Sequence, residues 1–297
     1  MSELVSVIVA TYHRDSTLRE ALNSLGCQTY SNIEIILVDD NAELEWNLGV
    51  EKIVANFKKQ YPNVKLVYSP NELNLGSART RNLGIHLSNG KYVTFLDDDD
   101  VYLPQKIENQ LSYMKENGLD FSVTDLELYY ENGKFVTRRN RNYIKQTDAS
   151  SLFEYHLMYH ITGTDTLMFK REYLVEIGGF MPIDVGDEFY LMQRAIEAKG
   201  KFGYLSACDV RAVIHTEGEG LSSGIGKIQG ENQLYEHKKK YFMKLSKKSI
   251  RYIKMRHYAV IAFAEKRRGK KIAFLKNGIR SVLCAPIACI KMLREMR

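Results

Sequence analysis

Apolar runs and amphipathic stretches alternate along residues 1–118. Nearly uninterrupted apolar segments at 4–10, 33–38 and 91–96 predict strands that are covered on both faces, and a shorter segment at 64–68 predicts another. Segments with helical spacing lie between them. This strand–helix alternation predicts a three-layer, Rossmann-like α/β fold on a mostly parallel sheet.

Local signals set the expected ends of the helices. Asp15 or Ser16 is expected to cap the first helix and Ser77 to cap the third, which is expected to stop at residues 88–90 with Gly90 as a glycine C-cap. A further helix follows Pro104, a residue that suits a first helical turn. Two of these helices have one apolar face that is predicted to pack inward: Leu18, Ala21, Leu22, Leu25, Ile107, Leu111 and Met114.

Residues 119–226 have a different pattern and predict that the sheet is mixed. Residues 121–130 are interpreted as one strand, 131–134 as a hairpin turn, and 138–148 as a basic, polar loop. The glycine-rich stretch 217–226 predicts a flexible lid or linker. Further helices are expected around 150–159, 171–177 and 187–198, and further strands at 166–169 and within 201–214.

The charge is divided unevenly along the chain. The net charge is +6, but residues 236–297 carry 19 Lys and Arg against 3 Asp and Glu. At 297 residues the chain is long enough for one large domain with an appendage. We therefore expect an α/β domain over 1–226, with halves at 1–118 and 119–226, and a basic helical extension over 227–297.

The cysteines and the hydropathy limit where the protein is expected to act. Cys27, Cys208, Cys284 and Cys289 follow no metal-ligand or disulfide spacing, which favours reduced thiols in a cytoplasmic protein. The N-terminus lacks the basic stretch of a signal peptide. No uncharged apolar segment reaches ~18 residues, so no membrane-spanning helix is predicted.

Four consecutive aspartates, Asp97–Asp100, follow the strand at 91–96. Neighbouring like charges repel one another, whereas carboxylate oxygens suit Mg²⁺ or Mn²⁺. Asp39 and Asp40 end the second strand in the same way. Because ligands bind at the carboxyl ends of parallel strands, we expect both acidic ends, side by side, to form one acidic crevice. The alternative for the run is a solvated acidic loop.

Five motifs in a fixed order give a more specific interpretation. Over residues 4–223 the chain resembles the family-two nucleotide-sugar glycosyltransferases, which have the GT-A fold. The matching segments are an opening strand (5–12), a second strand end (37–41), a glycine-to-Arg-Asn helix motif (74–85), an Asp-x-Asp strand (92–100) and the segment of the catalytic base (177–180 with 186–188).

The resemblance implies an activity. It is the inverting, metal-dependent transfer of one sugar from a nucleoside-diphosphate sugar, expected to be a UDP-sugar. The acceptor would be a hydroxyl of a glycan or lipid-linked molecule in the synthesis of a bacterial surface polysaccharide.

The resemblance also implies roles for the aspartate run. A Mn²⁺ or Mg²⁺ ion is expected to neutralise the charge of the departing diphosphate. Asp99 matches the last residue of the Asp-x-Asp motif, the expected metal ligand, although Asp98 could take that role because the frame is ambiguous. Asp97 matches the first residue, expected near the donor ribose or a metal-bound water. His215 stands where the family often has a histidine near the metal; a packed histidine is the alternative.

Further matching positions are expected to bind the nucleoside. Asp40, with Asp39 as its substitute, would accept hydrogen bonds from the base, and the alternative is a carboxylate that caps the following turn. Thr11 and Tyr12 would line the base pocket, with the Tyr12 ring available for stacking. Ordinary core packing is the alternative for Tyr12.

Three charged residues are expected near the reaction centre. Arg81 would place positive charge near the aspartates or the diphosphate, with Arg79 as its competitor and a surface salt bridge as the alternative. Asp187 is expected to be the general base that takes the proton of the acceptor hydroxyl; an N-cap is the alternative. Glu188 could replace it, because Gly186 stands where the family usually has a glutamate.

Other functions are disfavoured by missing signals. The Gln-x-x-Arg-Trp signature of processive synthases is absent, since the only tryptophan is Trp46. A nucleotidyltransferase would need a glycine-rich triphosphate loop, and residues 11–14 have no glycine. A non-catalytic nucleotide-sugar-binding scaffold stays open because of Gly186. No nucleic-acid-binding motif is found, so no nucleic acid is expected as a partner.

The basic tail over 236–297 predicts helices with Lys and Arg on the polar side. Its apolar residues are interrupted by Pro286, Lys276, Arg280 and Lys291, which excludes a membrane span but suits a helix lying in a membrane interface. Peripheral contact with the inner face of the cytoplasmic membrane is one hypothesis. The alternative is a helical appendage that packs on the main domain.

Overall fold

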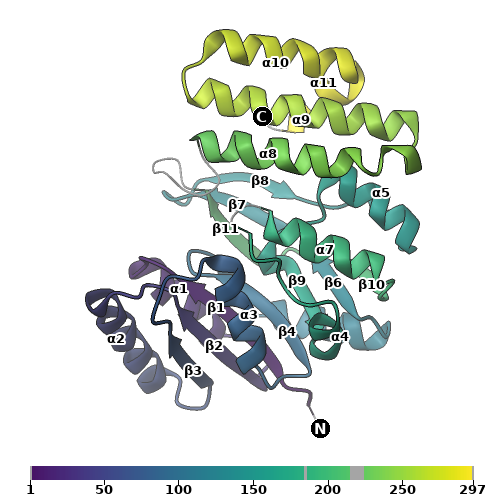
Figure 1. Ribbon diagram of the computed structural model, residues 1–297. Coiled ribbons are helices and arrows are strands. Elements are labelled where there is room, and N and C mark those ends of the chain that lie inside the picture. The colour runs from purple at the N-terminus through teal and green to yellow at the C-terminus, as the bar shows by residue number, and fades with distance from the viewer. Residues whose placement is uncertain (1, 184–185, 215–223, 296–297) are drawn as a thin grey trace. The chain divides into compact units, whose positions relative to one another are not determined.

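A computed structural model describes residues 2–183, 186–214 and 224–295 (Figure 1). Within these residues, no helix combines the length and the apolar character needed to cross a membrane.

The chain forms two compact units. Unit 1 comprises Met1–Ala149 and Ile161–Thr216, and unit 2 comprises Ser150–His160 and Glu217–Arg297. The sequence pattern did not anticipate that 150–160 would group with the C-terminal residues. The domain boundary at 226 and 227 stays a prediction.

Unit 1 is built on a seven-stranded sheet. Its strands are β1 (Val5–Thr11), β2 (Ile33–Asp39), β3 (Lys65–Pro70), β4 (Tyr92–Asp97), β6 (Phe121–Thr124), β9 (Leu167–Lys170) and β10 (Phe202–Leu205). Their order in the sheet is β10-β6-β9-β4-β1-β2-β3. Every pair is parallel except those of β9, which runs antiparallel to β4 and β6. The predicted mixed α/β sheet is confirmed.

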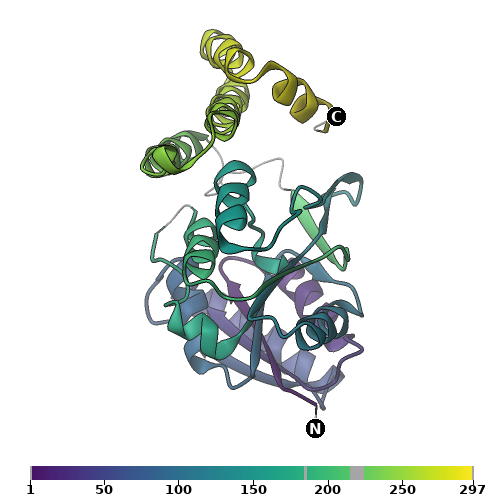
Figure 2. The same cartoon turned by 90° about the vertical axis from the view of Figure 1, so that its right-hand side faces the viewer.

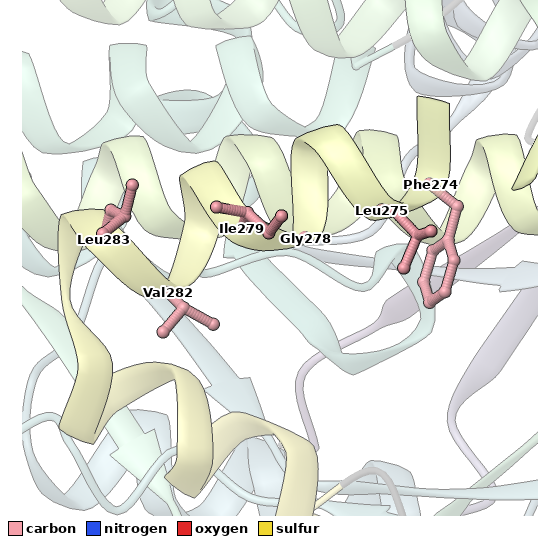
Figure 3. Close-up of a pocket in the computed structure, with 6 residues that line it drawn as sticks. All are labelled: Phe274, Leu275, Gly278, Ile279, Val282 and Leu283. Atoms are coloured by element: carbon pink, nitrogen blue, oxygen red, sulfur yellow. The ribbon is translucent and has the colours of Figure 1, made fainter. Parts of the chain in front are cut away.

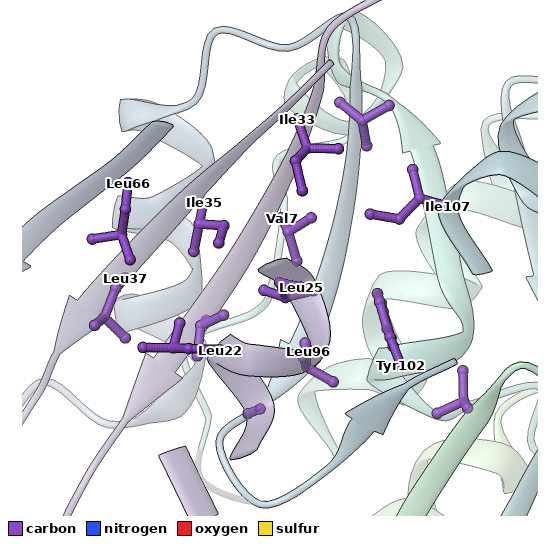
Figure 4. Packing of buried hydrophobic residues seen from close by; sticks show 14 of the residues in the cluster. Val7, Leu22, Leu25, Ile33, Ile35, Leu37, Leu66, Leu96, Tyr102 and Ile107 are labelled. Atoms are coloured by element: carbon purple, nitrogen blue, oxygen red, sulfur yellow. The ribbon is translucent and has the colours of Figure 1, made fainter. Parts of the chain in front are cut away.

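Helices cover both faces of this sheet. On one face, Val7 of β1 packs into a cluster with Leu22 and Leu25, as Figure 4 shows. On the other face, Ile8 lies so close to Gly84 that a Cβ there would be 2.4 Å from Ile8 Cγ2. All seven predicted inward-facing residues are buried. The helices of unit 1 are α1 (Ser16–Gly26), α2 (Leu44–Gln60), α3 (Ser77–Leu87), α4 (Lys106–Glu116), α6 (Arg171–Glu176) and α7 (Asp187–Glu197).

A second sheet of four strands has the order β5-β11-β7-β8. Its strands are β5 (Val101–Tyr102), β7 (Leu126–Tyr130), β8 (Phe135–Arg139) and β11 (Val210–Ile214). The hairpin turn at 131–134 is confirmed: it joins β7 to β8, with Gly133 at φ +77°.

The single strand expected over 121–130 is wrong, because Asp125 divides it between the two sheets. Asp125 is buried and accepts hydrogen bonds from Tyr204 Oη (2.7 Å) and Arg138 Nη2 (3.0 Å). The polar loop expected over 138–148 is also partly wrong, since β8 extends to residue 139 and Arg141 is buried. Asp125 thus bonds residues that are distant along the chain, and the strand ends there although the apolar residues on either side would continue it.

Two predicted caps are wrong. Gly76 is the N-cap of α3 and Ser77 its first residue, while Ser88 is the C-cap. Gly90 does not close the helix. It lies against β1, where a Cβ would be 2.6 Å from Ser6 N, so close packing rather than backbone conformation requires this glycine.

Unit 2 is helical in its described part. The helices are α5 (Ala149–Tyr159), α8 (Gly224–Lys239), α9 (Lys247–Arg267), α10 (Lys271–Cys284) and α11 (Pro286–Glu295). Rings connect α5 to this group: Phe153 contacts Tyr241 and Tyr159 contacts Tyr252, with centroids 5.0 and 4.8 Å apart. Figure 2 shows α8, α9 and α10 side by side. Helices in the tail are therefore confirmed, whereas the predicted lid over 217–226 falls mostly outside the described residues.

Candidate functional site

The candidate site lies at the carboxyl end of β4, where the aspartate run begins. Asp97 pairs with Ala10 on one side of β1, and Asp39 pairs with Thr11 on the other side. Strand β1 therefore separates the two acidic strand ends. The prediction that they lie side by side is wrong, because strand order along the chain does not fix strand order in the sheet.

Asp39 and Asp40 are buried, and the chain itself supplies their hydrogen-bond donors. Asp40 accepts from Asn71 Nδ2 (2.7 Å) and from two backbone N–H groups of the turn before α3 (2.8 and 2.9 Å). Asp39 accepts from Tyr68 Oη (2.7 Å) and from the side chain of Asn41 (2.6 Å). Both carboxylates therefore hold the loops around β2 in place.

Two members of the aspartate run face the loop after β1. Asp98 Oδ2 accepts a hydrogen bond from Tyr12 N at 3.1 Å, and Asp99 Oδ2 accepts one from Arg14 Nη2 at 3.0 Å. Arg14 Nε also lies 3.7 Å from Asp98 Oδ1. Burial and the charge of Asp99 raise the pKa of Asp98 to about 7. Arg14 offsets part of this repulsion, and the sequence interpretation gave it no role.

The other two aspartates form a group with Asp165, which lies in the 3-10 turn η1 (Thr164–Thr166). One oxygen atom from each of Asp97, Asp100 and Asp165 lies within 4.8 Å of the others. Burial and the charge of Asp97 raise the pKa of Asp165 to about 7, and burial and Asp165 raise the pKa of Asp100. Three crowded carboxylates are a chemically suitable donor set for Mg²⁺ or Mn²⁺.

This group differs from the expected metal ligands. Asp99 pairs with Arg14 instead, and His215 lies outside the described residues. Asp165 was missed because it follows no strand-end pattern and is 65 or more residues away from its partners along the chain. Only tertiary structure brings its carboxylate to the aspartate run.

Arg81 joins the aspartate run to the expected base. Its Nη2 donates to Asp97 Oδ1 (2.7 Å) and its Nη1 donates to Asp187 Oδ2 (3.1 Å). Burial alone would lower the pKa of Arg81, but Asp97 and Asp187 outweigh it and raise the pKa, so the group stays charged. The competing Arg79 has an exposed side chain.

Asp187 and Glu188 begin α7 but have different partners. Burial raises the pKa of Asp187 to about 6 although Arg81 opposes the shift. Glu188 accepts hydrogen bonds from Gly163 N (2.8 Å) and Thr164 Oγ1 (2.7 Å). These bonds anchor the loop that carries Asp165. A carboxylate whose pKa is raised toward neutrality suits general-base work, whereas Glu188 is already bonded by two donors of the 163–164 loop.

An aromatic stack borders the loop after β1. The rings of Tyr12 and His13 are stacked with centroids 4.0 Å apart, and His13 stacks in turn on Trp46 at 4.7 Å. Tyr12 is 48% exposed, so its ring has surface left for a ligand. Thr11 is buried beside it.

The chain is similar in sequence to known glycosyltransferases. The model of a family described as glycosyl transferase family 2 matches residues 6–178. A Rickettsia conorii protein named as an uncharacterized glycosyltransferase is 38% identical over 132 residues, covering 44% of this chain and 20% of the relative. The Escherichia coli UDP-Glc:alpha-D-GlcNAc-diphosphoundecaprenol beta-1,3-glucosyltransferase WfgD is 29% identical over 145 residues, covering 48% and 54%. The chain thus spans a fifth to about half of these relatives' lengths.

Two solved structures share the fold. Staphylococcus aureus TarS 1-349 in complex with UDP-GlcNAc has a TM-score of 0.59 at 18% identity, covering 92% of this chain and 90% of that one. The mannosyltransferase PcManGT of Pyrobaculum calidifontis, in complex with GDP-Man and Mn²⁺, also has a TM-score of 0.59 at 18% identity, covering 96% and 86%. The sheet and its covering helices are therefore those of the GT-A fold.

Proposed function

Because this chain belongs to glycosyl transferase family 2, we propose that it transfers one sugar from a nucleoside-diphosphate sugar to an acceptor hydroxyl. The observation that carries the proposal is the fork of Arg81, which bonds Asp97 with one nitrogen and Asp187 with the other. It links a carboxylate of the expected donor side to the candidate base.

Support for a nucleotide-sugar donor comes from the relatives. WfgD is named for a UDP-Glc donor, and the two structural neighbours bind UDP-GlcNAc and GDP-Man. We favour a UDP-sugar for this chain. In this proposal the exposed Tyr12 ring stacks on the base, and Thr11 lines the same pocket. If Asp40 and Asp39 also bind the nucleobase, its N–H groups would have to compete with the donors of the chain that already hydrogen-bond these carboxylates.

Four aspartates are proposed to serve a divalent ion. A bound Mn²⁺ or Mg²⁺ would neutralise the charge that develops on the leaving diphosphate. Asp97, Asp100 and Asp165 would hold it, with Asp99 available once it leaves Arg14. Arg81 and Arg14 would keep these carboxylates apart and oriented before the donor arrives.

Asp187 is the proposed general base. It would accept the proton of the acceptor hydroxyl while that oxygen attacks the anomeric carbon opposite the diphosphate, a single displacement that inverts the centre. Arg81 holds the Asp187 carboxylate through Oδ2, and the acceptor hydroxyl would bond its other oxygen. Glu188 is proposed to position the loop beside it.

A lipid-linked acceptor is the proposed substrate class, since WfgD is named for a GlcNAc-diphosphoundecaprenol acceptor. Under this proposal the reaction would belong to the synthesis of a surface polysaccharide, at the cytoplasmic side of a membrane.

A donor panel tests the proposal. Purified protein is incubated with UDP-Glc, UDP-GlcNAc, UDP-Gal or GDP-Man and a GlcNAc-diphosphate lipid, with Mn²⁺ or with EDTA, and the nucleoside diphosphate released is measured. We expect release from one donor that EDTA abolishes and Mn²⁺ restores. Arg81→Met should lose this activity, whereas the matched control Arg79→Met, from the exposed face of the same helix, should keep it. No release from any donor with Mn²⁺ present would reject the proposal.

A further inference from the structure

Helices α10 and α11 carry an exposed apolar stripe. Seven of the seventeen large apolar side chains that are exposed in the described residues lie within 272–290, each 43% to 85% exposed. In α10 they recur at helical spacing, as i, i+3, i+7 and i+10 or i+11. They are Ile272, Leu275, Ile279, Val282, Leu283, Ile287 and Ile290.

The α10 residues of the stripe face away from the helix that α10 packs against. Ser281 is buried and donates from Oγ to the carbonyl of Met255 in α9 (2.8 Å), which fixes the rotation of α10. Ile272, Leu275 and Ile279 lie roughly opposite Ser281 on the helix, because successive residues turn by about 100°. The apolar surface is therefore not the face that builds the helix pair.

This surface contains a shallow groove. It is lined by Phe274, Leu275, Gly278, Ile279, Val282 and Leu283, all from α10 (Figure 3). A glycine in the middle of a helix normally costs stability. A Cβ at Gly278 would meet no atom within 4 Å, so packing within the chain does not require this glycine, and it keeps the groove open.

Basic residues are frequent along these helices and in the segment before them. Between Lys266 and Lys291 there are eight Lys and Arg and no Asp or Glu. Lys276 and Arg280 project next to one edge of the stripe, and both are exposed. An apolar stripe bordered by cations on helices too polar to span is the pattern of a surface that lies in a membrane interface.

We propose that α10 and α11 bind an anionic lipid bilayer through this stripe, with its apolar side chains among the acyl chains and its cations at the headgroups. Charge complementarity selects this occupant. A second copy would bring the same cluster of cations against itself, which like-charge repulsion opposes, whereas anionic headgroups neutralise it. The binding does not depend on the proposed transfer reaction, although it would bring the enzyme close to a lipid-linked acceptor.

Vesicle flotation of the full-length protein tests the proposal. We expect flotation with phosphatidylcholine vesicles that contain phosphatidylglycerol, and little with phosphatidylcholine alone. The triple variant Leu275→Ser, Ile279→Ser, Leu283→Ser should lower the partition coefficient at least about tenfold, because each side chain would otherwise enter the interface. Since these side chains are exposed, circular dichroism and the unfolding temperature should not change.

A matched triple variant controls for the loss of exposed apolar surface. Ile225→Ser, Met243→Ser, Val175→Ser removes exposed apolar side chains outside the stripe and should bind vesicles like the wild type. Lys276→Gln, Arg280→Gln should weaken binding to the anionic vesicles alone.

Three results would overturn the proposal. The first is absence of wild-type flotation with anionic vesicles. The second is equal loss of binding in both triple variants. The third is a dimer, found by sedimentation equilibrium, that the stripe variant dissociates while flotation is unchanged. If the stripe variant does not fold, hydrogen exchange of the wild type decides: vesicles should protect 272–290, and no added protection there refutes the proposal.

Discussion

The carboxylates that end β2 and those that end β4 resemble each other in sequence and differ in structure. Asp40 receives three hydrogen-bond donors from its own chain. Asp98 and Asp100 face other carboxylates, and burial together with like charge raises the pKa of each. An acidic strand end thus serves the fold when local donors neutralise it, and is available for a cation when acidic neighbours crowd it.

The largest effect is expected at Asp187, the proposed general base, which Arg81 connects to Asp97 at the end of β4. Asp187→Asn keeps the shape of the side chain but cannot accept the proton, so the transfer rate should fall by about 10²–10⁴-fold. The measurement is the initial rate of sugar transfer at saturating donor.

Glu188→Gln is the matched control, because it changes the neighbouring carboxylate, whose two donors belong to the 163–164 loop. It should retain most of the activity. If Glu188→Gln is the inactive variant and Asp187→Asn the active one, the assignment of the base is reversed.

Opposite effects on stability are expected for the two strand ends. Asp40→Asn deprives three N–H donors, one buried and two partly buried, of a charged acceptor and should lower the free energy of unfolding by about 1–3 kcal/mol. Asp98→Asn removes a carboxylate that is disfavoured in the folded state and should raise it, on the order of 1 kcal/mol or more. Thermal unfolding of both variants, without added metal, measures the difference.

The pH dependence gives this pair a second test. The folded-state pKa of Asp98, about 7, lies above the unfolded value of about 3.9. The unfolded chain therefore releases this proton first, and the carboxylate costs stability progressively as pH rises from about 4 to about 7. Asp98→Asn should gain most above pH ~7 and little at pH ~4. Equal destabilisation by both variants would erase the distinction between the strand ends.

A smaller effect is expected at Tyr12, in the loop after β1 beside the aspartate run. Tyr12→Ala removes the ring proposed to stack on the base and should raise the KM for the donor about fivefold or more, with kcat less affected, since base–aromatic stacking contributes ~1–3 kcal/mol. Tyr12→Phe keeps the ring and should behave like the wild type. An unchanged KM in Tyr12→Ala would mean that the nucleobase of the donor does not stack on this ring.

The smallest effect is a displacement of the pH profile. Because burial raises the pKa of Asp187 to about 6, kcat/KM should fall about tenfold per pH unit below ~6 and level off above it. Arg81→Lys cannot bridge both carboxylates, so it stabilises the Asp187 anion less. The acidic limb of the profile should therefore move to higher pH by about one unit. If the acidic limb moves to lower pH instead, a group other than Asp187 controls it.

Local periodicity determined much of the scaffold. The strands at β1, β2 and β4 and the inward faces of α1 and α4 follow from apolar spacing, because neighbouring residues decide which face an element buries. The motif order also brought Arg81, Asp97 and Asp187 together as candidates. Asp97 ends a strand, Asp187 begins a helix and Arg81 lies in the second turn of another, near the edge where an α/β sheet binds ligands.

Only the tertiary structure decided how the charges are partnered. The insertion of β1 between β2 and β4, the approach of Asp165 to Asp97, and the division of 121–130 at Asp125 all depend on residues distant along the chain. The sequence pattern could not reveal them because hydrogen bonds and desolvation depend on distance in space, while periodicity reports only the nearest turns. The same reason explains α10: its spacing marked an apolar face, and only the orientation set by Ser281 left that face exposed.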